Sequence, residues 1–366
     1  MPKLEIADKE TLDYIKNKLL NMPKGGGLSV LECSGESVID YVDESVSTLP
    51  YSFYQGSAVV LNNEIHILGG NSTSSYLQHY KWNGSSWSSV STLPYPFYRG
   101  CAVVFNNEIH ILGSSYNSNH GTKHYKWNGS SWASVSTLPY SFYMGSAVVL
   151  NNEIHILGSN YSGNETKHYK WDGSSWVSVS TLPYSFYEGC AVVLNNEIHI
   201  LGSSNSNYYT KHYKFDGSSW TSVFTLPYSF YNGSAVVFNN EIHIMGGNNS
   251  TTTTTYHYKW NGSSWTSVST LPYGLSQGCV VILNEEIHNL GGGIGLTKHY
   301  KLNTTYKKLS LYLNQDQKVG IPYDLEEVTP ITNCTKEEKN LLVTEDGLTE
   351  FQIHTADDNI PITIKG

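Results

Sequence analysis

Histidine is the residue type in this chain that most suggests chemistry, because imidazole nitrogens bind metal ions and transfer protons. The 366 residues include 14 histidines, and twelve of these recur at two fixed positions of an internal repeat. One position follows Glu-Ile, as in His66, and the other precedes Tyr-Lys, as in His79. A metal ion needs nitrogens at about 2 Å from a single centre, whereas copies in separate repeats lie apart. We therefore expect no metal site and interpret these histidines as polar packing residues between repeats.

Carboxylates and thiols follow the same repeat and provide no separate catalytic group. Glu64 and its copies lie beside a tight turn, which indicates a solvated acid, and Cys101, Cys190 and Cys279 share one repeat position. These cysteines occur in alternate repeats, too far apart for a disulfide, whose Cα atoms lie within about 7 Å of each other. We interpret them as small, reduced core residues. Catalysis needs unlike groups gathered in one place, so we predict no enzyme, no catalytic residue and no cofactor.

The internal repeat predicts the elements that position these residues. Leu-Pro-Tyr recurs with a period of 44 or 45 residues, starting at Leu49, Leu93, Leu138, Leu182, Leu226 and Leu271. In the first copy, strands are predicted at 57–61 and 64–68, joined by a tight turn at Asn62-Asn63. Two more strands follow at about 78–82 and 86–91, joined at Asn83-Gly84. Six copies of four antiparallel strands predict an all-β fold, a six-bladed β-propeller.

Two features of the repeat resemble the kelch family of β-propellers. The second strand ends in a glycine pair at Gly69-Gly70, Gly246-Gly247 and Gly291-Gly292. A tyrosine lies seven residues before a tryptophan at Tyr80/Trp87, Tyr125/Trp132, Tyr169/Trp176, Tyr213/Trp220 and Tyr258/Trp265. Repeats two to four have Gly-Ser instead of the glycine pair, as at Gly113-Ser114, and repeat six lacks the tryptophan. The resemblance covers residues 38–303 and implies the fold, but kelch propellers serve many functions.

A strand ahead of the first complete copy suggests how the ring closes. Residues 44–50 match 88–94 at all but the first position. We expect an N-terminal strand at about 39–47 to complete the sixth blade; completion by 306–312, or a seventh blade built from both ends, are the alternatives. The predicted domains are 1–36, with an amphipathic helix at 8–20 and a Gly-rich linker, the propeller at 37–305, and a small β-rich module at 306–366.

The composition of the chain argues against nucleic acid and against a membrane as partners. The net charge is -9 with only 14% charged residues, and no Lys/Arg cluster is present that could neutralise phosphates, so we expect no nucleic acid. No run of about 18 apolar residues is present, so we expect no membrane insertion. The first residues lack the apolar segment of a secretory signal, from which we expect folding in the cytoplasm.

The positions at which the copies differ are the candidate binding residues. In the hexapeptide Tyr-Ser-Phe-Tyr-X-Gly, position X varies between nearly fixed neighbours: Gln55, Arg99, Met144, Glu188, Asn232 and Gln277. The loops between the second and third strands also vary, and they contribute Tyr76, Tyr116, Tyr161, Tyr208 and Tyr209. Strand order places both sets on one face of the propeller, with X near the mouth of the central channel. We interpret the fixed Tyr51, Phe53 and Tyr54 as packing residues.

This variation favours a recognition face. Exposed loops drift in sequence, but drift accounts less well for a single variable position between fixed residues. Tyr, Ser, Asn and Gly dominate the loops, a composition typical of surfaces that bind glycans or proteins. We therefore predict a non-enzymatic binding protein.

Residues 6–15 resemble a Thr-Leu-rich helical stretch of bacteriophage tail-fibre proteins. The resemblance implies a virion component, a tail or head fibre-like protein whose propeller face recognises a host-surface glycan or protein. Its ends would contact other virion proteins or sister copies of the chain, as a homo-oligomer. The alternatives are a cytoplasmic kelch adaptor for a partner protein and a kelch-type carbohydrate enzyme, an oxidase or a mutarotase.

Overall fold

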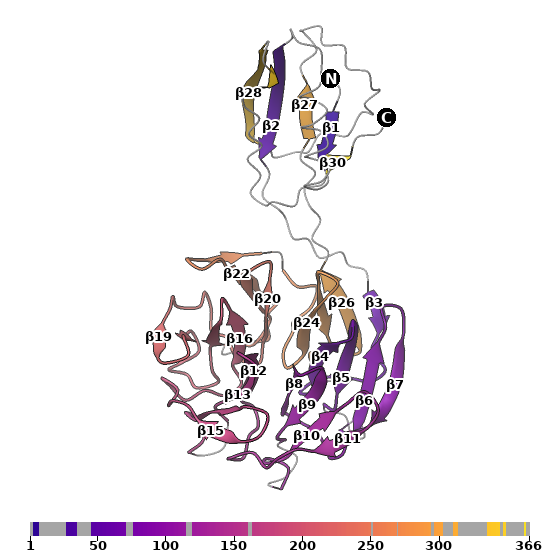
Figure 1. The fold of residues 1–366 in the computed structure, drawn as a ribbon, viewed down its shortest axis with the longest axis vertical. Helices are drawn as coiled ribbons and strands as arrows, with labels where there is room; N and C mark the ends of the chain where they lie inside the picture. The colour runs from indigo at the N-terminus through magenta and orange to yellow at the C-terminus, as the bar shows by residue number, and fades with distance from the viewer. Residues whose placement is uncertain are drawn as a thin grey trace. The chain divides into compact units, whose positions relative to one another are not determined.

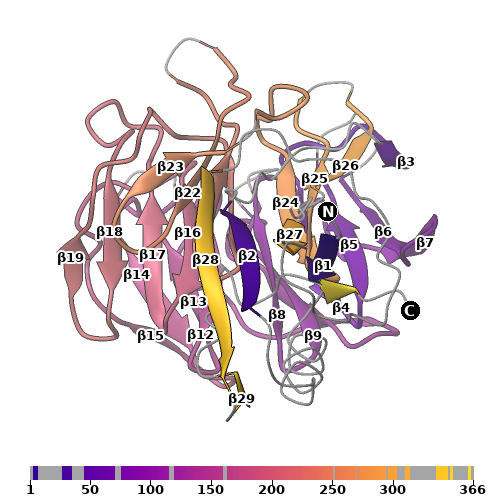
Figure 2. The same cartoon turned by 90° about the horizontal axis from the view of Figure 1, so that it is seen from above.

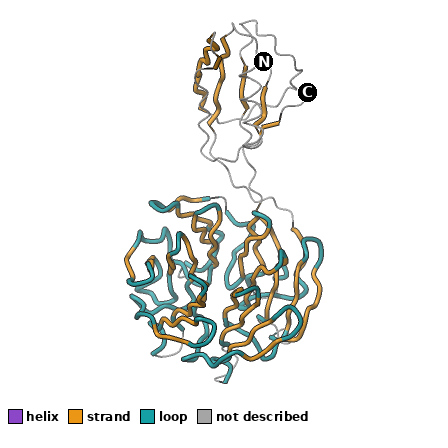
Figure 3. Tube along the Cα trace, viewed as in Figure 1, coloured by secondary structure: helices purple, strands orange, loops and turns teal. Residues whose placement is uncertain are grey.

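The protein divides into two compact units in a computed structural model. One unit comprises residues 40–303, and the other combines 1–39 with 304–366. The structure describes residues 45–70, 76–114, 119–159, 163–249, 252–268, 270–293 and 296–302, together with six strands of the second unit. This described part contains strands and loops (Figure 3). The helix predicted at 8–20 lies outside the described residues.

The larger unit is a six-bladed β-propeller, so the predicted fold class is confirmed. Six four-stranded antiparallel sheets form its blades (Figure 1). Blades 1 to 3 consist of β4 (Ser57–Leu61), β5 (Glu64–Leu68), β6 (Gln78–Trp82) and β7 (Trp87–Thr92); β8 (Cys101–Phe105), β9 (Glu108–Leu112), β10 (His124–Trp127) and β11 (Trp132–Ser134); and β12 (Ser146–Leu150), β13 (Glu153–Leu157), β14 (His168–Trp171) and β15 (Trp176–Ser178). Blades 4 to 6 consist of β16 (Cys190–Leu194), β17 (Glu197–Leu201), β18 (His212–Phe215) and β19 (Trp220–Ser222); β20 (Ser234–Phe238), β21 (Glu241–Met245), β22 (His257–Trp260) and β23 (Trp265–Ser267); and β24 (Cys279–Leu283), β25 (Glu286–Leu290), β26 (Lys298–Leu302) and β3 (Ser45–Thr48).

The N-terminal strand β3 closes the ring as the outer strand of blade 6. It pairs antiparallel with β26 (Figure 2), with Lys298 opposite Thr48. Behind it, Leu49 and Phe53 lie in one buried cluster with Val281 of blade 6. The alternative segment 306–312 overlaps β27 (Ser310–Leu313), which pairs within the other unit instead. Closure by β3 pairs the outer edge of β26, which would otherwise be free to recruit another chain.

Each blade is built by the turn and burial pattern of the repeat. Asn62 and Asn63 have φ angles of 51° and 61°, the left-handed pair that a two-residue hairpin with the correct twist requires. In the second strand, Ile65 and Ile67 are fully buried, because neighbouring blades cover both faces of the sheet. The buried clusters accordingly join successive blades, as Leu61 joins Ile109.

The first glycine of each pair is required by close contact between blades. Gly69 has a φ of +60°, and a Cβ there would lie 2.2 Å from the carbonyl oxygen of Phe97 in the next blade. The second position is less restricted, which explains the Gly-Ser copies. In blade 2 the Ser114 hydroxyl donates to the Pro96 carbonyl at 2.9 Å and accepts from the Tyr98 amide at 3.1 Å.

The described strands of the smaller unit come from both ends of the chain. They are β1 (Lys3–Ile6), β2 (Gly27–Ser34), β27, β28 (Thr335–Thr344), β29 (Gly347–Leu348) and β30 (Ile362–Thr363). They form one sheet in the order β29-β28-β2-β27-β1-β30. Sequence analysis separated an N-terminal attachment segment from a module at 306–366, whereas the structure combines them. Strand pairing between distant segments leaves no local signal, so the sequence could not show it.

Candidate binding site

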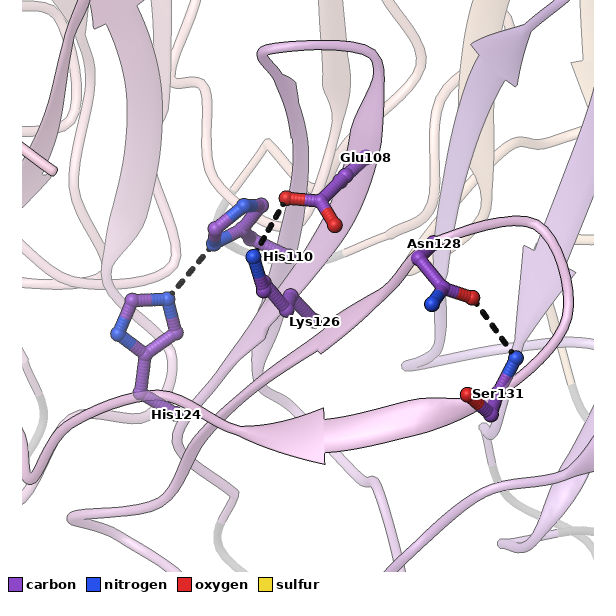
Figure 4. Close-up of polar contacts among 6 residues, drawn as sticks. All are labelled: Glu108, His110, His124, Lys126, Asn128 and Ser131. Carbon is purple, nitrogen blue, oxygen red and sulfur yellow. Dashed lines mark hydrogen bonds and ion pairs between the residues drawn. The ribbon is translucent and has the colours of Figure 1, made fainter.

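The twelve repeat histidines form six hydrogen-bonded pairs inside the blades. In each pair, Nδ1 of the first histidine lies 2.8–2.9 Å from Nε2 of the second, as in His110 and His124 (Figure 4). In five of the pairs, the second ring packs edge-on against an aromatic ring of the next blade, as His124 does against Trp171. Burial lowers the pKa of His110 to about 4 and that of His124 to about 3. The pairs are therefore neutral at neutral pH and connect adjacent blades.

The repeated acids also belong to the scaffold. Glu108 forms an ion pair with Lys126 on the adjacent strand at 2.8 Å (Figure 4), and every blade has the equivalent pair. Sequence analysis interpreted Glu64 and its copies as solvated acids and missed this cross-strand lysine. Beside it, the Ser131 amide donates to Asn128 Oδ1 at 2.9 Å and closes the second hairpin turn. Among the described residues, no group of three or more His, Cys, Asp or Glu could hold a metal ion.

The three repeat cysteines are free thiols, as the sequence predicted. Each donates to a glycine carbonyl of the next blade, for example Cys101 Sγ to Gly145 at 3.2 Å and Cys190 Sγ to Gly233 at 3.2 Å. Burial raises the pKa of each thiol to about 12. They are therefore protonated and serve as small donors between blades.

The six X residues converge on one pocket. The pocket has a volume of ≈ 150 Å³ and is lined by Gln55, Arg99, Met144, Glu188, Asn232 and Gln277, together with the glycine that follows each of them. Every blade thus contributes one side chain to a shared space. Because the six residues are of five different types, the pocket has no rotational symmetry although the scaffold around it repeats.

A closed ring of backbone hydrogen bonds holds the X residues in place. Each X amide donates to the X carbonyl of the preceding blade at 2.6–2.8 Å, and Gln55 donates to Gln277 to complete the circle. The backbone polar groups of the collar, as we call these six residues, are therefore paired with one another. Their side chains line the pocket.

All six X residues adopt left-handed backbone geometry, with φ between 55° and 62°. This conformation costs a non-glycine residue roughly 1–2 kcal/mol, and glycine adopts it freely. Yet no X position is glycine, and only Asn232 belongs to a type that tolerates this region well. The collar therefore retains side chains at positions where the backbone alone would favour glycine.

Polar contacts arrange the collar side chains into two groups. Gln55, in the amide orientation that satisfies its neighbours, accepts from Arg99 Nη2 at 2.7 Å and from Nε at 3.0 Å and donates to the Tyr98 hydroxyl. The Arg99 guanidinium also lies 5.0 Å from the centre of the Tyr98 ring. In the other group, Asn232 Nδ2 lies 3.3 Å from a Glu188 carboxylate oxygen. Positive and negative charge thus occupy different parts of one pocket.

The loop tyrosines do not all belong to this site. Tyr76 packs edge-on against Tyr98, and Tyr209 stacks on Tyr231, with centroids 5.8 Å and 5.0 Å apart. Both therefore support a tyrosine that directly precedes an X residue. Tyr208 instead packs against the buried Tyr184, so we assign it to the core. Tyr116 and Tyr161 lie outside the described residues.

The tyrosine directly before X, which the sequence assigned to packing, lies next to the collar in the chain. This tyrosine is half-buried in blades 1 to 5, whereas the phenylalanine before it is fully buried. Burial raises the pKa of Tyr231, and Tyr209 and Glu188 raise it further, so this phenol is neutral at neutral pH. Repeat six carries Ser276 at this position, so the tyrosine is not present in every blade.

Comparisons with known proteins support the fold and extend no further. No family model matches the chain, and no curated protein matches it. A solved structure named "Structure of YjhT" is similar with a TM-score of 0.62 and 14% sequence identity, covering 74% of this chain and 100% of that one. Within the described residues, no helix has the length and apolar character to cross a membrane. The strand pairing and the similar solved structure show that residues 40–303 form a six-bladed β-propeller. The likeness to the kelch family is a resemblance of the repeat sequence.

Proposed function

We propose that this protein is a non-enzymatic binding protein that recognises a host-surface glycan or protein through the channel-mouth pocket. The observation that carries the proposal is the collar: six side chains of five types gathered on one pocket, each held in a backbone geometry that favours glycine. Strained residues persist where the side chain has a use that offsets the cost. Recognition of an asymmetric ligand is such a use.

The size and chemistry of the pocket favour one small terminal group of a larger surface ligand. A cavity of about 150 Å³ accommodates a single six-membered ring, and this pocket has ≈ 150 Å³. Amides at Gln55, Asn232 and Gln277 provide donors and acceptors for hydroxyl groups. Beyond the collar, the half-buried Tyr98 and Tyr231 offer aromatic faces to the rest of the ligand.

We further propose that the chain is a virion component, a tail or head fibre-like protein. The resemblance of residues 6–15 to tail-fibre proteins supports this assignment, and the second unit, built from both ends of the chain, would attach the propeller to other virion proteins. Mass spectrometry of purified particles from the source should then detect the chain. An affinity pull-down dominated by one cytosolic partner, without particle association, would instead favour an intracellular adaptor.

The binding proposal is tested with the full chain on a glycan array and on whole cells of candidate hosts. Met144→Trp fills the pocket and should abolish binding. Ser130→Trp places the same bulk on an exposed hairpin turn and should leave binding unchanged. Absence of binding to any glycan or host, or equal binding by the two variants, would contradict the proposal.

A carbohydrate enzyme is the second candidate, favoured by one observation. Arg99 and Glu188 line the same pocket, and such a pair could polarise a sugar and transfer its proton. Exchange between sugar anomers, followed by NMR, separates this candidate from binding alone. A rate above the uncatalysed one that is lost in Glu188→Gln would replace the binding proposal.

A further inference from the structure

Two opposite charges line the pocket without neutralising each other. Arg99 is the sole arginine of the 366 residues, and Glu188 is the one carboxylate among the lining residues. No ion pair among the described residues includes either of them. A pair of charges in one small pocket therefore faces its occupant.

Neutral neighbours position both charges. Arg99 contacts the Gln55 amide and the Tyr98 ring, and its Nη1 lies 3.6 Å from Met144 Sδ. Among the described residues, the carboxylate of Glu188 accepts a hydrogen bond only from the side-chain amide of Asn232, at 3.3 Å. These contacts fix the orientation of the guanidinium and the carboxylate while leaving their charges unbalanced.

The order of the collar separates the two charges by an apolar side chain. Blade 3 lies between blades 2 and 4, so Met144 comes between Arg99 and Glu188 along the ring of backbone hydrogen bonds. An occupant that matches all three would present an anionic group, a short apolar spacer and a cationic group in that order. A ligand with one charge or none would remove water from Arg99 or Glu188 without replacing it, which is costly.

We propose that the group bound in this pocket is a small zwitterion, with its anionic end at Arg99, its ammonium end at Glu188 and its spacer against Met144. A free α-amino acid centre and phosphoethanolamine share this chemistry, because each carries an anionic group and an ammonium group on a short carbon unit. The inference rests on the proposed function, because it names the part of the surface ligand that the collar reads.

Saturation-transfer NMR on the full chain tests this directly, because it detects weak ligands. The probes are alanine and phosphoethanolamine as zwitterions, propionate as the anion alone, ethylamine as the cation alone, and glucose as a neutral sugar. We expect transfer to one or both zwitterions, which also distinguishes a carboxylate from a phosphate source, and at least about tenfold weaker binding of the singly charged and neutral probes. Equal binding of all probes, or binding of glucose alone, would overturn the assignment.

Two substitutions examine the two ends of the ligand separately. Glutamine already occupies the X position in blades 1 and 6, so Arg99→Gln and Glu188→Gln introduce a residue that the collar accommodates. Each should weaken zwitterion binding by about tenfold or more, whereas Lys126→Gln, outside the pocket, should not. Unchanged binding in both collar variants would also overturn the assignment.

The outcomes separate this inference from the proposed function. If glycans or cells bind in a Met144-dependent manner but no zwitterion does, the surface-recognition proposal stands and the zwitterion is wrong. If zwitterions bind through Arg99 and Glu188 but no surface polymer or cell binds, the pocket chemistry stands and surface recognition is wrong.

Discussion

At the scale of single residues, the left-handed backbone of the collar predicts how glycine substitutions change the stability of the protein. Replacing an X residue by glycine removes left-handed strain of roughly 1–2 kcal/mol, which stabilises the fold. The same change destabilises the fold by about 0.5–1 kcal/mol, because the unfolded chain gains conformational entropy. We therefore expect Glu188→Gly and Arg99→Gly to change the free energy of unfolding by less than about 1 kcal/mol. Urea unfolding of each variant measures this.

A matched glycine substitution outside the collar provides the control. Ala147→Gly lies inside β12, where the backbone is extended and a side chain packs against the core cluster of blades 2 and 3. It should destabilise the protein by about 0.5–1 kcal/mol or more. Collar variants that lose as much stability as Ala147→Gly would show that the X side chains serve the fold instead of a ligand.

A second residue, Phe224, interrupts the contact between blades 4 and 5. Other repeats have a serine at this position. The serine hydroxyl accepts a hydrogen bond from the tryptophan indole of the next blade, as Ser180 does from Trp220 at 3.0 Å. Phe224 is 66% exposed, and the buried Trp265 Nε1 and His212 Nδ1 have no partner among the described residues. The serine between His212 and Trp265 is missing.

We expect Phe224→Ser to stabilise the protein by roughly 1–3 kcal/mol, because it supplies a partner to two buried donors or acceptors. The reverse change, Ser180→Phe, should destabilise the contact between blades 3 and 4 by a similar amount. Thermal and urea unfolding compare the two variants with the parent chain. A less stable Phe224→Ser would show that the exposed ring contributes more than the lost hydrogen bonds.

At the scale of elements, the histidine pairs make the blades sensitive to acid. The second histidine of the pairs has a pKa lowered to about 3, as in His79, His168 and His299, with burial as the largest cause. The folded pKa lies below the ordinary value of 6.5, so the unfolded chain binds these protons first as pH falls. Stability is therefore constant above about pH 7 and is lost progressively from pH 6.5 downward.

The loss of stability should be large because one histidine pair occurs in each of the six blades. At pH 5.5 each excluded proton costs about 1.4 kcal/mol, and six second histidines together cost about 8 kcal/mol, which is comparable to the whole stability of many domains. Urea midpoints between pH 7.5 and pH 5 measure this. Carboxylates titrate mainly below that range, so an unchanged midpoint at pH 5 would show that the pairs accept protons without opening the blades.

The repeat explains why so much of the blade was readable from sequence. Turn residues such as Asn62-Asn63 and the alternation of β4 each predict a local geometry, and six copies confirm one another. The placement of the six X residues on one face could also be predicted from the sequence, because strand order assigns each loop to one side of the propeller. In contrast, the backbone ring between X residues and the orphaned Trp265 depend on contacts between blades, which no single copy encodes. The pairing of Glu108 with Lys126 lies within one copy and depends on the register of its second and third strands.

At the scale of the whole molecule, β3 is the strand that makes the ring continuous. A chain that begins at residue 49 lacks β3 and exposes the edge of β26, whereas one that begins at residue 40 keeps the complete larger unit. We expect the shorter chain to be less stable and to self-associate through that edge. Analytical ultracentrifugation and unfolding of both chains measure this; two monomers of equal stability would show that β3 is dispensable.

More of the larger unit than of the smaller unit could be predicted from the sequence. Repeats predicted the propeller and its closing strand, but the sheet shared by β2 and β28 involves segments from opposite ends of the chain. Neither segment has a partner copy with which to compare it. The candidate binding residues could be predicted because they are the exceptions to a repeat, whereas the tyrosines that precede them follow the repeat and carry no such signal.

Binding of a captured surface glycan or host cell to the six single X→Gly variants tests the central claim most directly. The collar accounts for recognition by unlike residues, so affinity should fall in several variants and by unequal amounts, with the largest losses at Arg99 and Glu188. Folding should persist in all six, as shown by unfolding curves measured in parallel. Six variants that bind as tightly as the parent chain would contradict the claim that the channel mouth is the recognition site.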